Sequence, residues 1–331
     1  MWDPRTYEDT DYGLDDGESF EPDLDLDDEH FDPTMPHIMT VLGPIEPEEL
    51  GVCIPATRFL PERVPGQPDR ERSRALAEAA DELEAFASVG GRGVVDIATA
   101  RSGRDTPALQ RLTQLVPSHI VTAAGLGSEM DDPVQSLMRE LEGGIDRTGV
   151  HAGLIAIRTG DLLHDGLLER TLDVAVQRGM PLLIEMESWD DAPQILSAQL
   201  RQHGITSHNP APHLILTGPG TIPDAELIAE AAQAGAFVTL RTGGPGHHHD
   251  ETLFAQRIVD LGSDGLDAAI LITMDLVAPR VRLAMPVEPR SPYLIDRLAL
   301  SLMNAGASAL DVRRIMIENP ARALTIFPPP M

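Results

Sequence analysis

The sequence alternates short apolar runs with longer amphipathic stretches eight times after residue 39. Continuous runs rich in Val, Ile and Leu are typical of strands that are buried on both faces of a parallel sheet. The stretches between them, such as 74–89 and 165–179, have the pattern of helices. Each parallel crossover needs a helix, so eight such units predict an α/β fold with a closed (β/α)8 TIM barrel. The predicted strands are 51–59, 91–99, 118–126, 151–159, 181–187, 213–218, 236–242 and 268–275.

Residues 1–36 differ from the rest of the chain. They hold fourteen Asp or Glu residues against one Arg, with isolated aromatic residues between them. So little apolar surface and so much like charge predict a segment that is disordered in isolation. Two interpretations remain open: a solvated acidic tail, or a segment that docks on a basic protein partner or closes over the molecule as a lid. The prediction is therefore an acidic tail over 1–36 and a barrel over 37–331.

The cysteine count and the N-terminal residues predict the compartment. A single cysteine, Cys53, excludes an internal disulfide, and it lies within the first predicted strand as an inert core thiol. The N-terminus has neither a basic nor an apolar region of a signal peptide. No stretch approaches the roughly 20 apolar residues that cross a bilayer. We therefore expect a cytoplasmic protein with no membrane contact.

The charge of the chain excludes several classes of function. The net charge of −28 disfavours nucleic acids and anionic lipid surfaces as partners. All 25 basic residues are arginine. Without lysine the chain has no Schiff-base chemistry, no covalently bound pyridoxal phosphate, no P-loop lysine and no carboxylated lysine between two metals.

Several blocks of the sequence together resemble the phosphotriesterase-like proteins of the amidohydrolase superfamily. They are TVLGPIEPEELG (40–51), VVDIATARSGRD (94–105), HIVTAAGL (119–126), AGLIAIRTG (152–160) and IENPARAL (317–324). The resemblance covers nearly all of 40–326 in the order that the family has. It implies a TIM barrel and, in view of how the family assembles, a homodimer as the default expectation.

The resemblance also implies a binuclear metal centre, and here the sequence departs from the family. The family holds its metals with an H-x-H pair, a carboxylated lysine, two further histidines and an aspartate. Alanine and glycine supply no ligand atom, and arginine repels a dication. We therefore predict that the chain has no metal and no other cofactor. The matching positions here are Ala56 and Arg58, Ala156, Glu185, Gly218 and Asp275.

Arginines and acids stand at the predicted strand ends where the metals would lie. Paired N–H donors of arginine suit carboxylate or phosphate oxygens, which favours a pocket for a small anionic molecule. Asp275 or Glu185 would then act as general acid or base. The alternative is a buried ion-pair network that only fills the former metal cavity. The candidate binding arginines are Arg58, Arg101, Arg158 and Arg241, with Arg104 nearby in the loop that follows the second strand.

Two further features lie near the predicted mouth. The loop after the seventh strand carries three adjacent histidines, of which His247 and His249 are candidate catalytic residues. A solvent-exposed polar loop and a metal-binding tract are the other interpretations of this segment. Trp189 follows the fifth strand, where it could stack on a ligand or pack against the barrel.

Two classes of function remain open from the sequence. The first is a metal-independent enzyme, repurposed from a phosphotriesterase-like hydrolase for acid/base chemistry on a small anionic substrate, in the way that superfolds serve specialised biosynthesis. The second is a catalytically inactive relative that binds a ligand or a partner. The substrate and the reaction are not determined by these residues.

Overall fold

The structure is a computed structural model of the 331-residue chain. The acidic tail, except for Asp32 and residues 34–36, and the histidine tract 247–249 lie outside the described residues, so the predictions for them stay predictions. Within the described parts, no helix combines the length and the apolarity that crossing a bilayer requires. The structure describes residues 32, 34–62, 68–127, 132–162, 166–203, 213–220, 222–242, 251–276 and 289–328.

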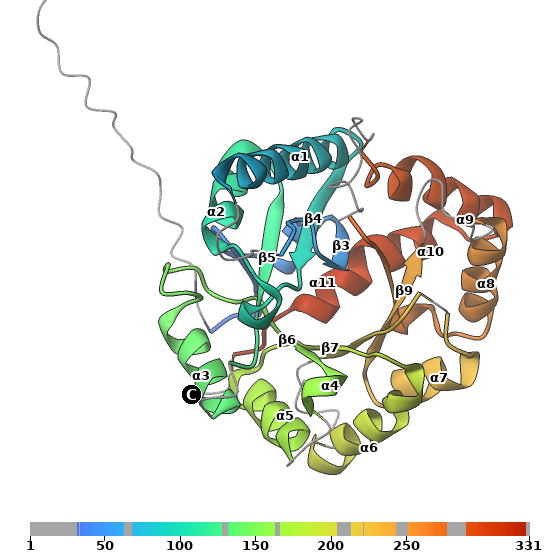
Figure 1. The fold of residues 1–331 in the computed structure, drawn as a ribbon. Coiled ribbons are helices and arrows are strands. Elements are labelled where there is room, and N and C mark those ends of the chain that lie inside the picture. The colour runs from blue at the N-terminus through green and yellow to red at the C-terminus, as the bar shows by residue number, and fades with distance from the viewer. Residues whose placement is uncertain are drawn as a thin grey trace, which may run out of the picture. The chain divides into compact units, whose positions relative to one another are not determined.

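Eight parallel strands form the central barrel, and all eight fall inside the predicted runs (Figure 1). Neighbouring strands in the chain are neighbours in the sheet, from β10 to β3. The barrel closes where β10 lies beside β3, and the Thr273 hydroxyl donates to the Ala56 carbonyl there. The predicted TIM barrel is confirmed. Its strands are β3 (Val52–Thr57), β4 (Gly91–Asp96), β5 (His119–Ala124), β6 (Leu154–Arg158), β7 (Leu182–Glu185), β8 (Leu214–Thr217), β9 (Phe237–Thr242) and β10 (Ile270–Met274).

A ring of helices covers the outside of the barrel (Figure 1). Several of them start or stop at sequence signals: the Asp224 carboxylate accepts from the Leu227 N–H at 2.9 Å at the start of α7, and Gly179 in the left-handed conformation ends α5. The α-helices are α1 (Asp69–Ser88), α2 (Thr106–Leu115), α3 (Pro133–Gly143), α4 (Thr159–Leu162), α5 (Leu167–Arg178), α6 (Ala192–His203), α7 (Ala225–Gln233), α8 (Glu251–Ser263), α9 (Ala299–Ala305), α10 (Ala309–Arg313) and α11 (Asn319–Leu324). Short 3-10 segments are η1 (Pro47–Leu50), η2 (Ala100–Ser102), η3 (Trp189–Asp191) and η4 (Asp267–Ala269), and π-helical turns are η6 (Leu294–Leu298) and η7 (Arg314–Glu318).

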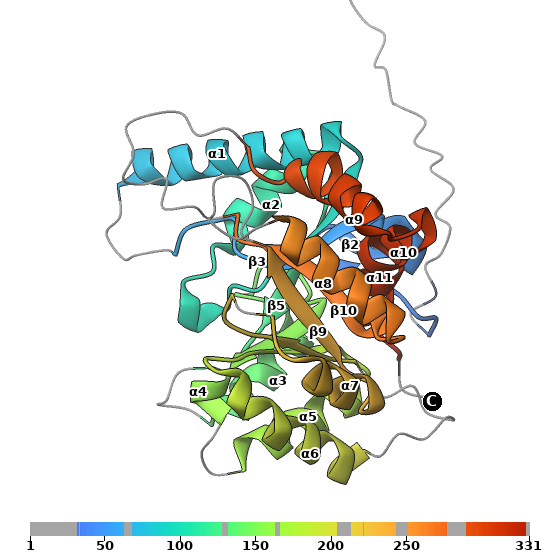
Figure 2. The same cartoon turned by 90° about the vertical axis from the view of Figure 1, so that its right-hand side faces the viewer.

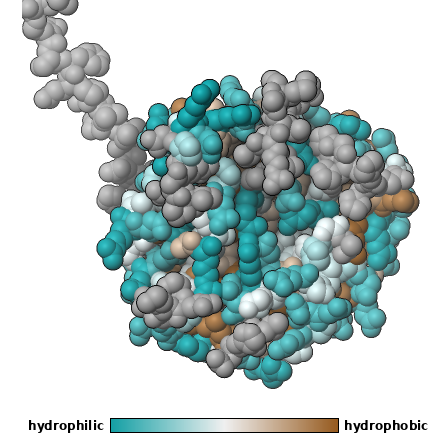
Figure 3. Space-filling view, in the orientation of Figure 1, coloured by the Kyte–Doolittle hydropathy of each residue, from teal (hydrophilic) through white to brown (hydrophobic). Residues whose placement is uncertain are grey.

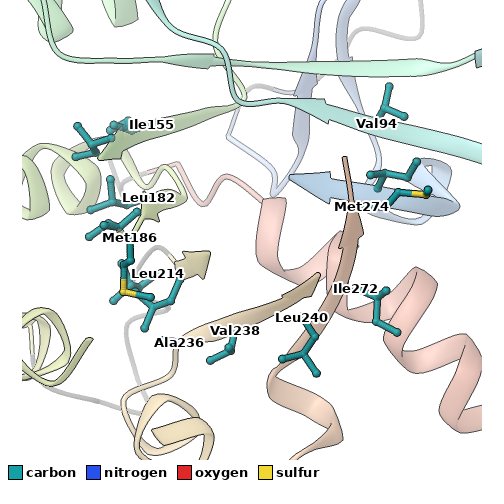
Figure 4. Close-up of a cluster of buried hydrophobic side chains, with 14 of the residues drawn as sticks. Val94, Ile155, Leu182, Met186, Leu214, Ala236, Val238, Leu240, Ile272 and Met274 are labelled. Atoms are coloured by element: carbon teal, nitrogen blue, oxygen red, sulfur yellow. The ribbon is translucent and has the colours of Figure 1, made fainter. Parts of the chain in front are cut away.

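Alternate strand residues face two separate apolar layers, because side chains alternate across a strand. The outer layer packs between the strands and the helices and includes Val94, Ile155 and Met274 (Figure 4). The inner layer fills the barrel axis and includes Leu183 and Ile215. This separation explains why the strands read as continuously apolar, since both of their faces are buried.

The amino ends of the strands are closed by a floor. A hairpin of β1 (Ile38–Thr40) and β2 (Gly43–Ile45) lies there, and His37 and Ile326 exchange backbone hydrogen bonds of 3.2 and 2.7 Å. Ile38 and Leu324 complete the inner apolar layer. In Figure 2, α4 and α11 lie at opposite ends of the barrel. The carboxyl ends of the strands, on the side of α4, therefore form the mouth.

Gly179 offers a direct test of how the floor is assembled. Its φ is +62°, and an added Cβ would lie 1.6 Å from the Phe327 carbonyl oxygen. The Phe327 N–H also donates a 2.9 Å hydrogen bond to the Gly179 carbonyl. We expect Gly179→Ala to lower the free energy of unfolding by about 2–3 kcal/mol, from left-handed strain plus a lost hydrogen bond. Gly235→Ala is the matched control, because Gly235 has φ +69° but open space around its Cβ, and should lose only about 1 kcal/mol. Equal losses in urea denaturation would contradict the steric argument.

Candidate functional site

The predicted site residues do come together at the mouth. Arg58 follows β3, Arg158 and Glu185 end β6 and β7, Arg241 lies near the end of β9, and Asp275 follows β10. Parallel strands of a barrel end at one edge, which places these side chains in one layer. The face in Figure 3, which looks onto the mouth, is hydrophilic across its centre between the grey atoms.

The centre of the mouth is an ion pair between opposite sides of the barrel. Arg58 donates from Nη1 and Nη2 to the two carboxylate oxygens of Glu185, at 2.9 and 2.6 Å. Arg158 donates from Nε to the same carboxylate at 3.1 Å. Such a bidentate pair fixes both the position and the plane of the groups. Glu185 is thus held between two arginines.

These contacts decide the protonation of the pair. Burial alone would raise the pKa of Glu185, but the hydrogen bonds and charge of Arg58, with the charge of Arg158, bring that pKa below its ordinary value. Burial also opposes the charge of Arg58, but Glu185 outweighs it and raises the pKa of Arg58. Both groups are therefore charged at neutral pH, and Glu185 is a weak proton acceptor.

A second ion pair joins Arg241 to Asp275. Arg241 Nη1 donates to Asp275 Oδ1, and the side chain of Asp275 is 60% exposed. Among the described residues, no hydrogen bond reaches the other carboxylate oxygen of Asp275. This oxygen is open to a ligand or to water, which distinguishes Asp275 from Glu185.

Arg101 and Arg104 differ in their exposure to the mouth. Arg101 donates from Nε to the Gly127 carbonyl at 2.6 Å and pairs with Asp161, and it lines a cavity of the mouth. Arg104 instead has no exposed side-chain surface. It donates to the Ala123 carbonyl at 2.6 Å and pairs with carboxylates of α3 and the loop that follows it, Glu140 and Asp146. The expectation that Arg104 lines the mouth is therefore wrong, because these acceptors hold it beneath the loop.

Four of the six positions that match metal ligands of the family carry side chains that cannot ligate a metal, and Glu185 and Asp275 are the exceptions. Ala56 and Ala156 are buried among inner-layer residues, and Arg58 already pairs with Glu185. At Gly218 an added Cβ would lie 2.5 Å from the Trp189 ring, so the indole occupies the space that a larger side chain would need. Trp189 thus packs on the end of β8, and the described residues contain no cluster of three or more His, Cys, Asp or Glu that could hold a metal. The donor set does not fit a binuclear centre.

Two cavities open on either side of the Arg58–Glu185 pair, and both are lined by that pair. We call the first, of about 330 Å³, the Leu126 cavity; it is lined by Arg58, Ile97, Thr99, Arg101, Ser102, Leu126, Ala156, Ile157, Arg158, Gly160, Asp161, Leu183, Glu185 and Glu187. We call the second, of about 490 Å³, the Arg290 cavity; it is lined by Arg58, Glu185, Met186, Gly218, Pro219, Gly220, Arg241, Thr242, Asp275 and Arg290. The ion pair therefore divides the mouth.

Sequence reasoning missed Arg290, which lies beyond the last predicted strand. The backbone N–H groups of Arg290 and Ser291 each donate to the buried Glu82 carboxylate of α1, at 2.6 Å. This long-range anchor helps to hold residue 290 at the mouth, and the sequence carries no local signal for it.

Asp96 is a buried acid at the end of β4. It is 1% exposed and accepts one hydrogen bond of 3.2 Å, from the Ala98 N–H. Burial raises its pKa to about 6, against the opposing effects of that bond and of the charges of Arg58 and Arg104.

The expectation that Cys53 is a core thiol is confirmed: Cys53 is buried, and burial raises the pKa of its thiol.

Comparison with known proteins now assigns the family. The family model described as the phosphotriesterase family matches residues 36–324. The chain belongs to the phosphotriesterase family. Human N-acetyltaurine hydrolase is 24% identical over 271 residues, which span 74% of this chain and 76% of that protein.

Solved structures with the same fold include a family enzyme and a binding protein. The phosphotriesterase from Mycobacterium tuberculosis superposes with a TM-score of 0.70 at 16% identity, covering 87% of this chain and 98% of that one. A resiniferatoxin-binding protein from Rhodobacter sphaeroides gives 0.70 at 21% identity, covering 87% and 94%. At these identities the structures support the fold of the family member and leave its activity open.

Asp96 makes the stability of the protein depend on pH. Its folded-state pKa of about 6 lies above the ordinary 3.8, so its contribution is present below about pH 4 and is lost as the pH rises through about 6. We expect Asp96→Asn to gain about 2–3 kcal/mol relative to the wild type between pH 4 and pH 7, since the amide stays neutral. Denaturant unfolding at both pH values measures this difference. Asp260→Asn on exposed α8 is the control, and an equal gain there would contradict the assignment.

Proposed function

We propose that this family member works without metals, as an enzyme of hydrolase type that binds a small anionic substrate at its mouth. The observation that carries the proposal is the bidentate Arg58–Glu185 pair, held by Arg158, at positions that match metal ligands in the family. A fixed guanidinium at this place repels dications and attracts anions. The pair satisfies Glu185 internally and leaves Asp275, whose side chain is 60% exposed, as the more accessible carboxylate.

The geometry supports a division of roles between these groups. Asp275 is the general base: its open oxygen takes a proton from water as the water oxygen bonds to the substrate carbonyl carbon. The same proton then passes to the leaving amine or alcohol as the old bond to carbon breaks. Arg58 and Arg241 bear positive charge beside the position where negative charge develops. Glu185 positions Arg58 and is not the base, because its pKa is lowered.

The name of the human relative suggests which bond to test. That protein is an N-acetyltaurine hydrolase, and N-acetyltaurine combines an amide bond with a sulfonate anion. An N-acylated small acid is consistent with a mouth that carries arginines and one open carboxylate. We therefore include amides of this kind in the substrate panel.

A second function is favoured by one observation. The two carboxylates that are candidates for acid/base roles, Glu185 and Asp275, are already paired with arginines, and this suits a catalytically inactive protein that binds its ligand without turnover. A family fold is also found in a resiniferatoxin-binding protein. Binding without product formation across the panel would favour this alternative.

Metal content is the first test of the proposal. We expect the purified protein to contain far less than one transition-metal ion per chain, because four of its six aligned positions carry Ala, Gly or Arg and the two carboxylates, Glu185 and Asp275, are paired with arginines. Dialysis against a chelator should leave anion binding and any turnover unchanged. Elemental analysis by plasma mass spectrometry measures the content, with a metal-dependent family enzyme as positive control. Stoichiometric zinc that is needed for activity would contradict metal independence.

Removal of the proposed base is the second test. The panel consists of N-acetyltaurine, N-acetyl amino acids and small lactones. For a compound that is hydrolysed, Asp275→Asn should lower kcat by about 10²–10⁴-fold with little change in KM, since it removes proton transfer and keeps the shape. Asp260→Asn serves as the matched control. A variant with full kcat would exclude Asp275 as the base.

A further inference from the structure

The Arg58–Glu185 pair separates two groups of strands at the mouth. It joins the end of β3 to the end of β7. The strand order of the barrel places β4, β5 and β6 on one side of this line, and β8, β9 and β10 on the other. The Leu126 cavity is lined from the first group, by residues such as Leu126 and Ile157. It therefore lies across the pair from Asp275, which lines the Arg290 cavity.

The bottom of the Leu126 cavity is apolar. Ile97, Ala156 and Leu183 line it and belong to the inner apolar layer that fills the barrel axis. Leu126 and Ile157, of the outer layer, add further apolar surface to its wall. This surface suits the apolar part of a ligand, because carbon atoms that lie there are removed from water.

A second ion pair bounds this cavity along the arc of β4, β5 and β6. Arg101 of η2, which follows β4, pairs with Asp161 of α4, which follows β6, and both side chains line the cavity. Arg101 also donates from Nε to the carbonyl of Gly127, which follows β5, at 2.6 Å. We call Arg101–Asp161 the rim pair, because it spans the ends of three successive strands.

Both ends of the rim pair are anchored. On the η2 side, the Ser102 hydroxyl accepts from the Thr99 N–H at 2.8 Å, and Arg104 is held beneath the loop by the Ala123 carbonyl. On the α4 side, a backbone N–H from the segment after β7 donates to the Thr159 hydroxyl at 3.2 Å. The two side chains of the rim pair are only 27% and 28% exposed, so water screens them less than a fully exposed pair. The rim pair is therefore a fixed wall of the cavity.

The wall leaves little room. The cavity measures about 330 Å³, which is at the small end of the range of roughly 300–1,000 Å³ for small-molecule sites. An apolar group that enters over the Arg58–Glu185 pair meets the rim pair on the other side of the same cavity. A longer group would have to separate Arg101 from Asp161, which would leave two partly buried charges without their partners. A short group fits without this cost.

We propose that the Leu126 cavity receives the apolar acyl group of the substrate, and that the rim pair limits this group to a short chain. Arg101 and Asp161 are then specificity-determining residues. The inference rests on the proposed hydrolase function, and it adds the class of acyl group that the mouth accepts and the two residues that select it.

A series of acyl compounds of increasing chain length tests the inference. The series consists of the acetyl, butanoyl, hexanoyl and octanoyl amides of taurine and of glycine. Calorimetry gives the affinity of compounds that are only bound, and kcat/KM replaces it for compounds that are hydrolysed. In the wild type, the value should rise by up to about fourfold for each methylene that is buried, and peak at a short member. The octanoyl compound should fall below that peak by about tenfold or more, because it has to break a charge-assisted contact.

Two variants remove the limit from opposite ends of one contact. Arg101→Ala shortens the wall, and Asp161→Ala releases the guanidinium from it. In each variant the ratio of octanoyl to acetyl affinity should rise by about 10- to 100-fold over the wild type. Arg178→Ala is the matched control, because it breaks a similar pair, with Glu142, and both of these residues line neither cavity. It should keep the wild-type ratio. If one mouth variant fails to fold, the other still carries the test.

The other outcomes separate this inference from the proposed function. A steady rise in affinity from acetyl to octanoyl in the wild type would overturn the length limit and leave the proposed function standing. An unchanged ratio in both Arg101→Ala and Asp161→Ala would do the same, and a loss that is equal for all chain lengths in Arg101→Ala would assign Arg101 to the anion instead. If the wild type neither bound nor hydrolysed any member of the series, both proposals would fail.

Discussion

The Arg58–Glu185 pair sets the chemistry of the whole mouth. It joins β3 to β7 across the barrel axis with two hydrogen bonds, and Arg158 adds a third to the same carboxylate. The resemblance to the family implies two metal dications at the matching positions. Here a guanidinium that cannot lose its proton places a fixed positive charge at the barrel end.

The rest of the mouth is arranged around this substitution. The Trp189 ring fills the space at Gly218, where a larger side chain would clash with it. The pair also costs desolvation free energy, because two charges are partly removed from water, and the third partner, Arg158, offsets part of this. A division of the mouth into two cavities is the geometric result, with Arg290 on one side and Leu126 on the other.

The arginines that gather at the mouth contrast with the net negative charge of the whole chain. A net charge of −28 repels anions at long range, so an anion is held only by the arginines that it contacts directly. Among the described residues, Arg58, Arg101, Arg158, Arg241 and Arg290 line the two cavities of the mouth.

The sequence by itself determined the fold, because eight apolar runs separated by amphipathic stretches bury both faces of their strands in a helix-covered parallel sheet, and the blocks that resemble a barrel family indicate that this sheet closes. It also placed Arg58, Arg158, Glu185 and Asp275 in one layer, since strand ends of a barrel share an edge. Tertiary structure alone decided which charges pair, which depends on side-chain reach across the axis. It also decided that Arg290 joins the mouth, because a buried carboxylate more than two hundred residues earlier, Glu82, holds that backbone. Local pattern carries no information about such contacts between distant segments.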